Sequence, residues 1–119
     1  MDGVAAHTLP KEERLSGRSA VSALLSTGRY GVAGPLKYCY TRGNGLAYSR
    51  ILISVPKRSF KRAVKRNLLK RRIRESYRLQ KALLGPGVDI LFIYTPKEVL
   101  PFAAIHAAMG EALSAVSEK

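Results

Sequence analysis

Apolar residues recur at three- and four-residue intervals in three stretches of the chain. This spacing predicts helices, each with one side that packs on a core. The three stretches are 17–27, 60–84 and 101–116. Ser16 and Ser59 stand just before the first two and are the expected N-caps, because a hydroxyl at that position accepts a hydrogen bond from a free backbone amide.

Two other stretches, 36–42 and 49–55, alternate apolar and polar residues as half-buried strands do. The turn-forming sequence Gly-Asn-Gly at 43–45 separates them, which predicts that they pair as a hairpin. The stretch 88–94 is apolar on both faces, which is typical of a central strand. A further short strand has room near 29–30.

Positive charge is concentrated in the middle helix and in the residues that precede it. The stretch 57–78 holds 11 of the chain's 21 Lys and Arg residues and one acid, Glu75. At 100° per residue, one stripe of the helix is basic while Leu69, Ile73 and Tyr77 lie roughly opposite. The stripe consists of Asn67, Lys70, Arg71, Arg74 and Arg78.

Such a stripe predicts an anionic partner. Like charges four residues apart cost a few tenths of a kcal/mol per pair unless an anion neutralises them, and solvated helix faces normally mix the two signs. The planar guanidinium of Arg grips phosphate with two hydrogen bonds and stacks on bases, which favours RNA.

Composition limits the remaining possibilities. A chain of 119 residues with a net charge of +13 is expected to form one domain that binds nucleic acid. Without an 18-residue apolar run or a signal sequence, we expect no membrane partner and a cytoplasmic location. Cys39 is the single cysteine, and His7 and His106 lack ligand spacing, so no metal site is expected.

The motif AVKRNLLKRRIRESYR, preceded by ISVPKR and by LPKEERL near the N-terminus, resembles the protein subunit family of bacterial ribonuclease P. The helix of that family has the form A-V-x-R-N-R-x-K-R-x-x-R-E. The matching residues here are Ala63, Val64, Arg66, Asn67, Lys70, Arg71, Arg74 and Glu75. Leu68 stands where the family has its second Arg, and Arg72 is a candidate to replace that contact.

The resemblance implies an α+β fold, a two-layer sandwich of a small mixed sheet and helices in the order α-β-β-(β)-α-β-α. This fold is shared with a domain of a small-subunit ribosomal protein. The general rule makes a β-α-β crossover right-handed, whereas the resemblance implies a left-handed one. Residues 1–8 are expected to form a flexible lead-in to a single RNA-binding domain, 9–117.

The resemblance also implies a function, which is removal of the 5′ leader from precursor tRNA by endonucleolytic cleavage. In that family the RNA subunit is the catalyst and requires Mg²⁺, while the protein binds no cofactor of its own. The expected partners are the ribonuclease P RNA, in a 1:1 complex with monomeric protein, and the precursor tRNA. The expected RNA-binding residues are Lys57, Arg58, Lys61, Arg62, Lys65, Arg66, Asn67, Lys70, Arg71, Arg74 and Arg78.

In the family, the first helix presents aromatic residues to a cleft for the single-stranded leader. Here the corresponding residues are Val21 and Leu25, which cannot stack on a base as a ring does. Tyr40 and Tyr38 are the candidates to supply the stacking, although tyrosines on strands also serve packing alone. With Arg14, these residues make up the expected leader cleft.

Three other functions fit the charge. A structural RNA-binding protein of the ribosomal kind would explain the helix without a role in cleavage. A DNA-binding protein would need a second helix in a helix-turn-helix arrangement or a dimerisation segment, and neither is seen, so we expect no DNA partner. A protein-only nuclease would need an acid–base pair or clustered carboxylates, and the acids of the chain form no such group, so no catalytic residue is expected.

Overall fold

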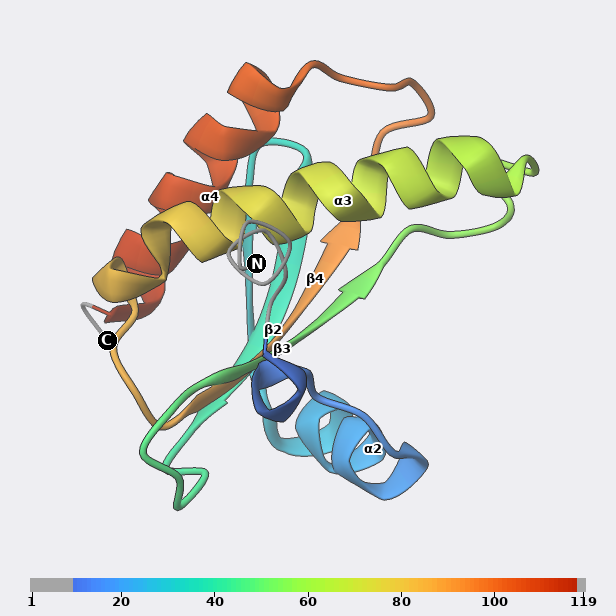
Figure 1. Ribbon diagram of the computed structural model, residues 1–119. Coiled ribbons are helices and arrows are strands. Elements are labelled where there is room, and N and C mark those ends of the chain that lie inside the picture. The colour runs from blue at the N-terminus through green and yellow to red at the C-terminus, as the bar shows by residue number, and fades with distance from the viewer. Residues whose placement is uncertain (1–9, 118–119) are drawn as a thin grey trace, which may run out of the picture.

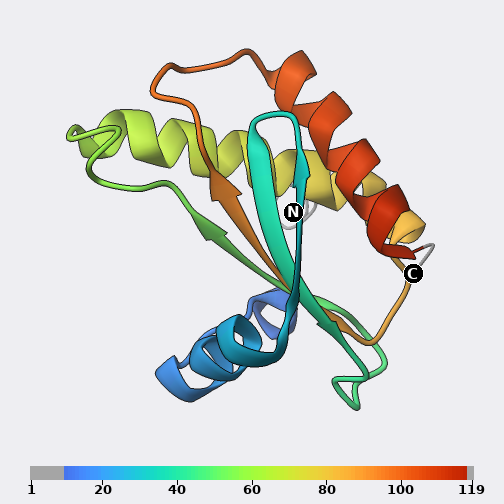
Figure 2. The same ribbon diagram turned by 180° about the vertical axis from the view of Figure 1, so that it is seen from behind.

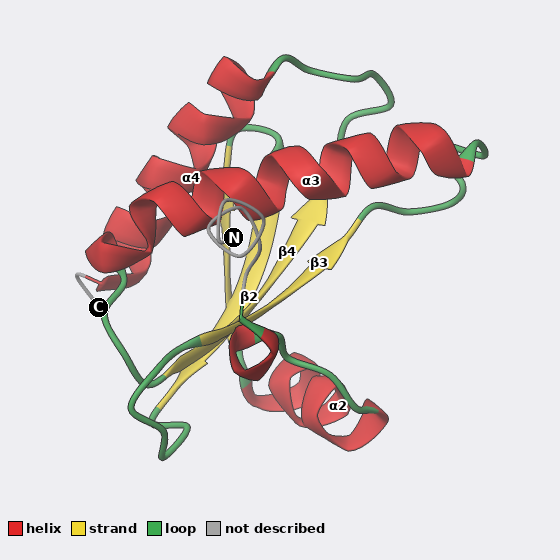
Figure 3. Ribbon diagram, in the orientation of Figure 1, coloured by secondary structure: helices red, strands yellow, loops and turns green. Residues whose placement is uncertain are grey.

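The computed structural model of the protein describes residues 10–117, and its helices and strands keep the predicted order (Figure 1, Figure 3). The elements are the short 3-10 helix η1 (Lys11–Glu13), α2 (Arg18–Thr27), β1 (Arg29–Ala33), β2 (Leu36–Arg42), β3 (Arg50–Ser54), α3 (Ala63–Gln80), the 3-10 helix η2 (Lys81–Leu83), β4 (Val88–Tyr94) and α4 (Phe102–Ser117).

The strands form one mixed sheet in the order β1-β2-β4-β3. β1 and β2 are an antiparallel hairpin, so the short strand near 29–30 is confirmed and extends to Ala33. The predicted hairpin between β2 and β3 is wrong, because β4 lies between them, antiparallel to β2 and parallel to β3. The physical reason is that β4 is apolar on both faces, so the centre of the sheet is where it buries most surface.

The connection from β3 through α3 to β4 is a left-handed crossover. With α3 in front of the sheet and β3 and β4 pointing upward, β4 lies to the left of β3, and the view from behind agrees (Figure 1, Figure 2). The handedness follows the family resemblance and is opposite to the general rule for such units.

The two faces of the sheet carry different helices. α3 and α4 pack side by side on one face, called here the α3 face, over a core that includes Leu36, Phe92 and Met109. α2 partly covers the opposite face, called here the α2 face, with a smaller cluster of Leu15, Leu24, Cys39 and Leu91. The α2 face is therefore only partly covered by helix (Figure 2).

Neither predicted N-cap is correct. α2 is preceded by Gly17, whose φ of 96° takes the chain into the helix through the left-handed region that glycine tolerates. α3 begins after Arg62, three residues later than a cap at Ser59 would place it, and neither helix has a side-chain cap. The segment before α3 instead forms its own turn, in which the amides of Ser59 and Phe60 donate to the carbonyl of Pro56.

Candidate RNA-binding surfaces

Helix α3 lies on the sheet with the face that the sequence predicts. Leu69 and Ile73 are fully buried and Tyr77 is 1% exposed, so the stripe on the other side of the helix turns outward. Most of the expected RNA-binding residues are exposed, and four of them are half-buried. The exposed residues are Lys57, Arg58, Lys61, Arg62, Lys65, Asn67 and Arg71, and the half-buried ones are Arg66, Lys70, Arg74 and Arg78.

Three arginines of α3 have partners within the protein. Arg66 Nη1 donates to the carbonyls of Phe60 and Lys61, at 2.7 and 2.9 Å, so this side chain fixes the loop that carries the exposed lysines. Arg78 forms a two-bond ion pair with Glu75. Arg72 Nη1 donates to the Leu100 carbonyl at 2.6 Å and ties α3 to the segment before α4. Arg72 is thus already engaged, which argues against its replacing the missing Arg at position 68.

Leu68 lies on the side of α3 that faces the segment between β4 and α4. It lines two shallow pockets, one with Phe102 and one with Val99. An apolar side chain suits this partly buried position, and the departure from the family motif therefore falls on a side of α3 away from Lys70 and Arg74.

A groove of about 270 Å³ runs between α3 and the edge of β3. The segment before α2 joins that edge, since the Leu15 amide donates to the Ile51 carbonyl at 2.7 Å. Arg14 is thereby brought to Lys70 and Arg74 in the groove, which we call the β3-edge groove. Among residues 10–117, no carboxylate forms an ion pair with any of these three.

The electrostatic cost of this arrangement is visible at Arg74. Burial lowers the pKa of its guanidinium, and the positive charge of Arg14 lowers it further. An arginine remains charged at neutral pH despite such a shift. The protein therefore holds concentrated positive charge that a phosphate would stabilise.

The predicted leader cleft is divided between the two faces of the sheet. Leu36, Tyr38 and Tyr40 share the α3 face, as the alternation of β2 requires, and both tyrosines are nearly buried, at 7% and 5% exposure. Val21 and Leu25 belong to α2, which packs on the opposite face. A single cleft cannot contain both pairs. The sequence did not reveal this, because the face on which α2 packs is set by tertiary structure.

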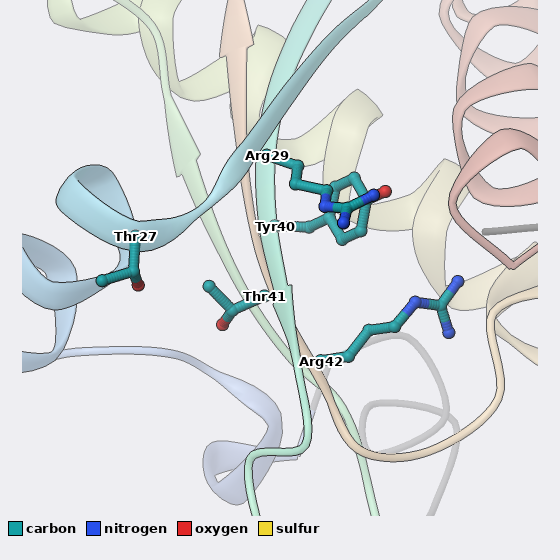
Figure 4. A pocket seen from close by; sticks show the side chains of 5 residues that line it. All are labelled: Thr27, Arg29, Tyr40, Thr41 and Arg42. Carbon is teal, nitrogen blue, oxygen red and sulfur yellow. The ribbon is translucent and has the colours of Figure 1, made fainter.

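Tyr40 lines a different pocket, of about 420 Å³, at the open end of the β1–β2 hairpin (Figure 4). Its other lining residues are Thr27, Arg29, Thr41 and Arg42. The Arg42 guanidinium donates to the Val116 carbonyl near the end of α4, so this arginine joins the helix to the sheet.

Two residues that the sequence did not single out stand on the α2 face. Tyr30 of β1 lies opposite Cys39 in the hairpin register and is 53% exposed. Lys37 of β2 is exposed, and its Nζ lies 5.6 Å from the centre of the Tyr30 ring. The register of β1 against β2 would have revealed them, because it places Tyr30 and Cys39 on one face and Tyr40 on the other.

Asp89 is the only acid in the four strands, and its charge is compensated. Arg50 donates to both carboxylate oxygens, at 2.9 and 2.7 Å, and the Asn44 side chain donates to one of them at 3.0 Å. Burial by itself would raise the pKa of Asp89, but the hydrogen bonds from Arg50 and Asn44 outweigh it and hold the pKa below its usual value. The α2 face therefore offers no unpaired strand carboxylate to repel a phosphate.

Residues 10–117 hold no group of three His, Cys, Asp or Glu side chains that could bind a metal ion. In the same part of the chain, no helix has the length and apolar character needed to cross a bilayer. His106 stacks on Phe102 with ring centres 5.1 Å apart and contacts Gln80, whose Nε2 donates to the His106 carbonyl at 2.9 Å. These contacts give His106 a packing role between α3 and α4.

The fold and these surfaces define a class of protein, a small basic α+β protein with a positively charged crossover helix on its surface. Residues 9–117 match the family model described as Ribonuclease P, and the chain therefore belongs to the ribonuclease P protein family. The role of that family is removal of the 5′ leader from precursor tRNA.

Relatives and solved structures agree with this assignment. The ribonuclease P protein component of Porphyromonas gingivalis (strain ATCC BAA-308 / W83) is 38% identical over 114 residues, which is 88% of this chain and 83% of that protein. The ribonuclease P protein from Thermotoga maritima superposes with a TM-score of 0.77 at 28% identity, covering 87% of this chain and 96% of that one. The Staphylococcus aureus protein shares the fold, with a TM-score of 0.75 at 22% identity over 85% and 92% of the two chains.

Proposed function

We propose that this chain binds the ribonuclease P RNA through α3 and the loop before it, and that the RNA subunit carries out the endonucleolytic cleavage. In this proposal the protein is a monomer in a 1:1 cytoplasmic complex, Mg²⁺ is held by the RNA, and no cofactor is bound by the protein. The RNA-binding residues are the 11 that the sequence predicts between Lys57 and Arg78, extended by Arg14.

The observation that carries the proposal is the β3-edge groove. Arg14, Lys70 and Arg74 come from two distant parts of the chain and meet without an acid to pair with them among the described residues. The mutual repulsion of such a cluster costs folding free energy unless a bound anion neutralises the charges. RNA phosphates supply that anion, and their counterions are released on binding.

The β3-edge groove also connects the basic side of α3 with the α2 face of the sheet. It is lined by Leu52 and Ile53, whose side chains belong to the α2 face and the α3 face respectively. We therefore assign the α2 face, with Val21 and Leu25 of α2, to the single-stranded leader of precursor tRNA. An RNA that follows α3 reaches this face without crossing an unpaired strand carboxylate.

The test is cleavage of a precursor tRNA by its cognate ribonuclease P RNA at low Mg²⁺, with and without the protein. We expect strong stimulation by the protein and no cleavage after the RNA is removed. Because basic side chains screen RNA phosphates, the stimulation should shrink as Mg²⁺ is raised.

A structural RNA-binding protein is the alternative, since the charge of α3 alone fits it. That function predicts binding to the RNA without any change in the cleavage rate. Cutting that persists after the RNA is degraded would instead contradict catalysis by the RNA.

A further inference from the structure

Tyr30 is the aromatic residue that β1 places on the α2 face. The residue is 53% exposed, whereas Tyr38 and Tyr40 on the other face are 7% and 5% exposed. Within the four strands, no other aromatic side chain points to the α2 face. Burial in a core therefore explains Tyr38 and Tyr40 but not Tyr30.

The exposed ring is held in place at two points. The Tyr30 hydroxyl donates to the Leu25 carbonyl at 3.0 Å, which ties the ring to the end of α2. The Lys37 ammonium lies over the ring, 5.6 Å from its centre. A tyrosine has only two side-chain torsions, so a ring fixed in this way loses little entropy when another ring stacks on it.

The two contacts differ in strength, and the difference matters for a ligand. A cation over an exposed ring is held only weakly, so Lys37 can move aside at low cost. Its ammonium then remains close enough to pair with a phosphate next to the stacked ring. The hydrogen bond to Leu25, in contrast, keeps the ring oriented while Lys37 moves.

The surroundings of the ring are apolar and open. Leu25 is 42% exposed on α2, and Val32, two residues along β1 on the same face, is 68% exposed. A flat aromatic ring with apolar neighbours and one adjacent cation is the arrangement that binds an unpaired nucleotide, by its base and its phosphate.

We propose that Tyr30 is the stacking platform for one base of single-stranded RNA, and that Lys37 binds the neighbouring phosphate. The proposal rests on the proposed function, in which the α2 face receives the leader of precursor tRNA. Because every base has a flat face, the contact discriminates unpaired from paired nucleotides and tolerates any sequence.

The experiment measures binding of precursor tRNA to the reconstituted holoenzyme, with leader bases replaced one at a time by abasic sites. For the wild-type protein we expect one leader position at which the abasic site weakens binding by about 5- to 150-fold. The Tyr30→Leu variant, which keeps an apolar side chain without the ring, should show the same loss on the intact leader and no further loss at that position.

Two more variants complete the series. Tyr30→Phe keeps the ring but not the hydrogen bond to Leu25, so it should restore most of the binding that Tyr30→Leu loses. Lys37→Ala should reduce the slope of log K against log salt by the amount expected for about one phosphate contact. Leu79→Ala, on the exposed side of α3 at 54% exposure, removes comparable apolar surface elsewhere and is expected to bind like wild type.

Different results would overturn the stacking role of Tyr30 and the assignment of the α2 face to the leader. If the wild type prefers precursor to mature tRNA but Tyr30→Leu binds the intact leader equally well, the platform is overturned and the surface is retained. If the wild type binds precursor and mature tRNA equally, the leader surface is overturned and the platform with it. The abasic series on the wild type needs no variant and is independent of any effect of a substitution on folding.

Discussion

The packing of Tyr38 against Gly31 shows how a single residue shapes the α3 face. The two residues are directly opposite in the hairpin, and a Cβ built on Gly31 would overlap the Tyr38 ring. The buried ring therefore occupies the space that a side chain at position 31 would need. The ring also covers the glycine backbone.

Gly31→Ala should lower the free energy of unfolding by about 1–3 kcal/mol, because the added methyl group forces the ring out of a packed site. Val32→Ala, at the exposed neighbouring position, should change it by less than about 0.5 kcal/mol. Urea denaturation followed by circular dichroism measures both. Equal stability of Gly31→Ala and wild type would contradict the close contact.

Asp89 makes stability depend on acid pH. Because its pKa is lower in the folded chain than in the unfolded one, its contribution is present above the unfolded value of about 3.9 and is lost as the pH falls toward the folded value. Asp89→Asn should be less stable than wild type at pH 7 and should lose less stability below about pH 4. Thermal unfolding between pH 7 and pH 2.5 tests this, and parallel curves for the two proteins would exclude a contribution from Asp89.

At the scale of residues, the sequence predicts burial better than it predicts contacts. The alternation in β2 correctly separates Tyr38 and Tyr40 from Cys39, because a strand has a period of two. That alternation does not say which face becomes the core and which receives α2. The aromatic residue on the open face, Tyr30, was for this reason not identified from the sequence.

Helix α3 combines two kinds of arginine, and they should respond differently to substitution. Arg71 is exposed, while Arg66 fixes the carbonyls of Phe60 and Lys61. Arg71→Ala should leave the melting temperature unchanged and reduce the slope of log K against log salt for RNA binding by about 0.7–0.9, the value for one phosphate contact.

Arg66→Ala should weaken RNA binding and also lower the melting temperature, because two backbone carbonyls lose their partner. Leu79→Ala, exposed on the same helix, is the control for both variants. Filter binding at several salt concentrations and thermal unfolding give the two measurements. A salt slope for Arg71→Ala equal to that of wild type would mean that this residue does not contact phosphate.

At the scale of elements, the pattern of apolar residues predicts the three long helices and the strands β2, β3 and β4, and β2 and β4 have the predicted bounds. For β1 the sequence indicated only that a short strand has room. Periodicity does not predict which strands pair with one another. The pairing of β3 with β4 joins segments separated by the whole of α3, so no local turn signal marks it. The faces of α3 were predictable because a helix determines its own faces, whereas a sheet requires distant segments.

The net charge of +13 gives the whole molecule a stability that depends on anions. Arg14, Lys70 and Arg74 meet only when the protein is folded, so an anion that binds them favours the folded state. Sulfate should raise the melting temperature more than chloride at equal ionic strength. When the sulfate concentration is a hundred times its dissociation constant, the bound anion adds about 2.7 kcal/mol to the free energy of unfolding.

Lys70→Ala should remove much of this difference between the two salts, because it takes one charge from the cluster. Lys97→Ala, an exposed lysine outside the β3-edge groove, should retain it. Coinciding melting curves in sulfate and chloride would show that general screening, rather than a bound anion, acts on the protein.

The central position of β4 also affects the order in which the protein can assemble as it is made. β2 and β3 leave the ribosome before β4, yet both pair with β4, which is the last of the strands that the structure describes to be synthesised. Until residue 94 has emerged, β3 has no strand to pair with and α3 has no complete sheet to cover. Until that point the nascent chain exposes its most basic segment without the sheet that α3 covers in the folded protein.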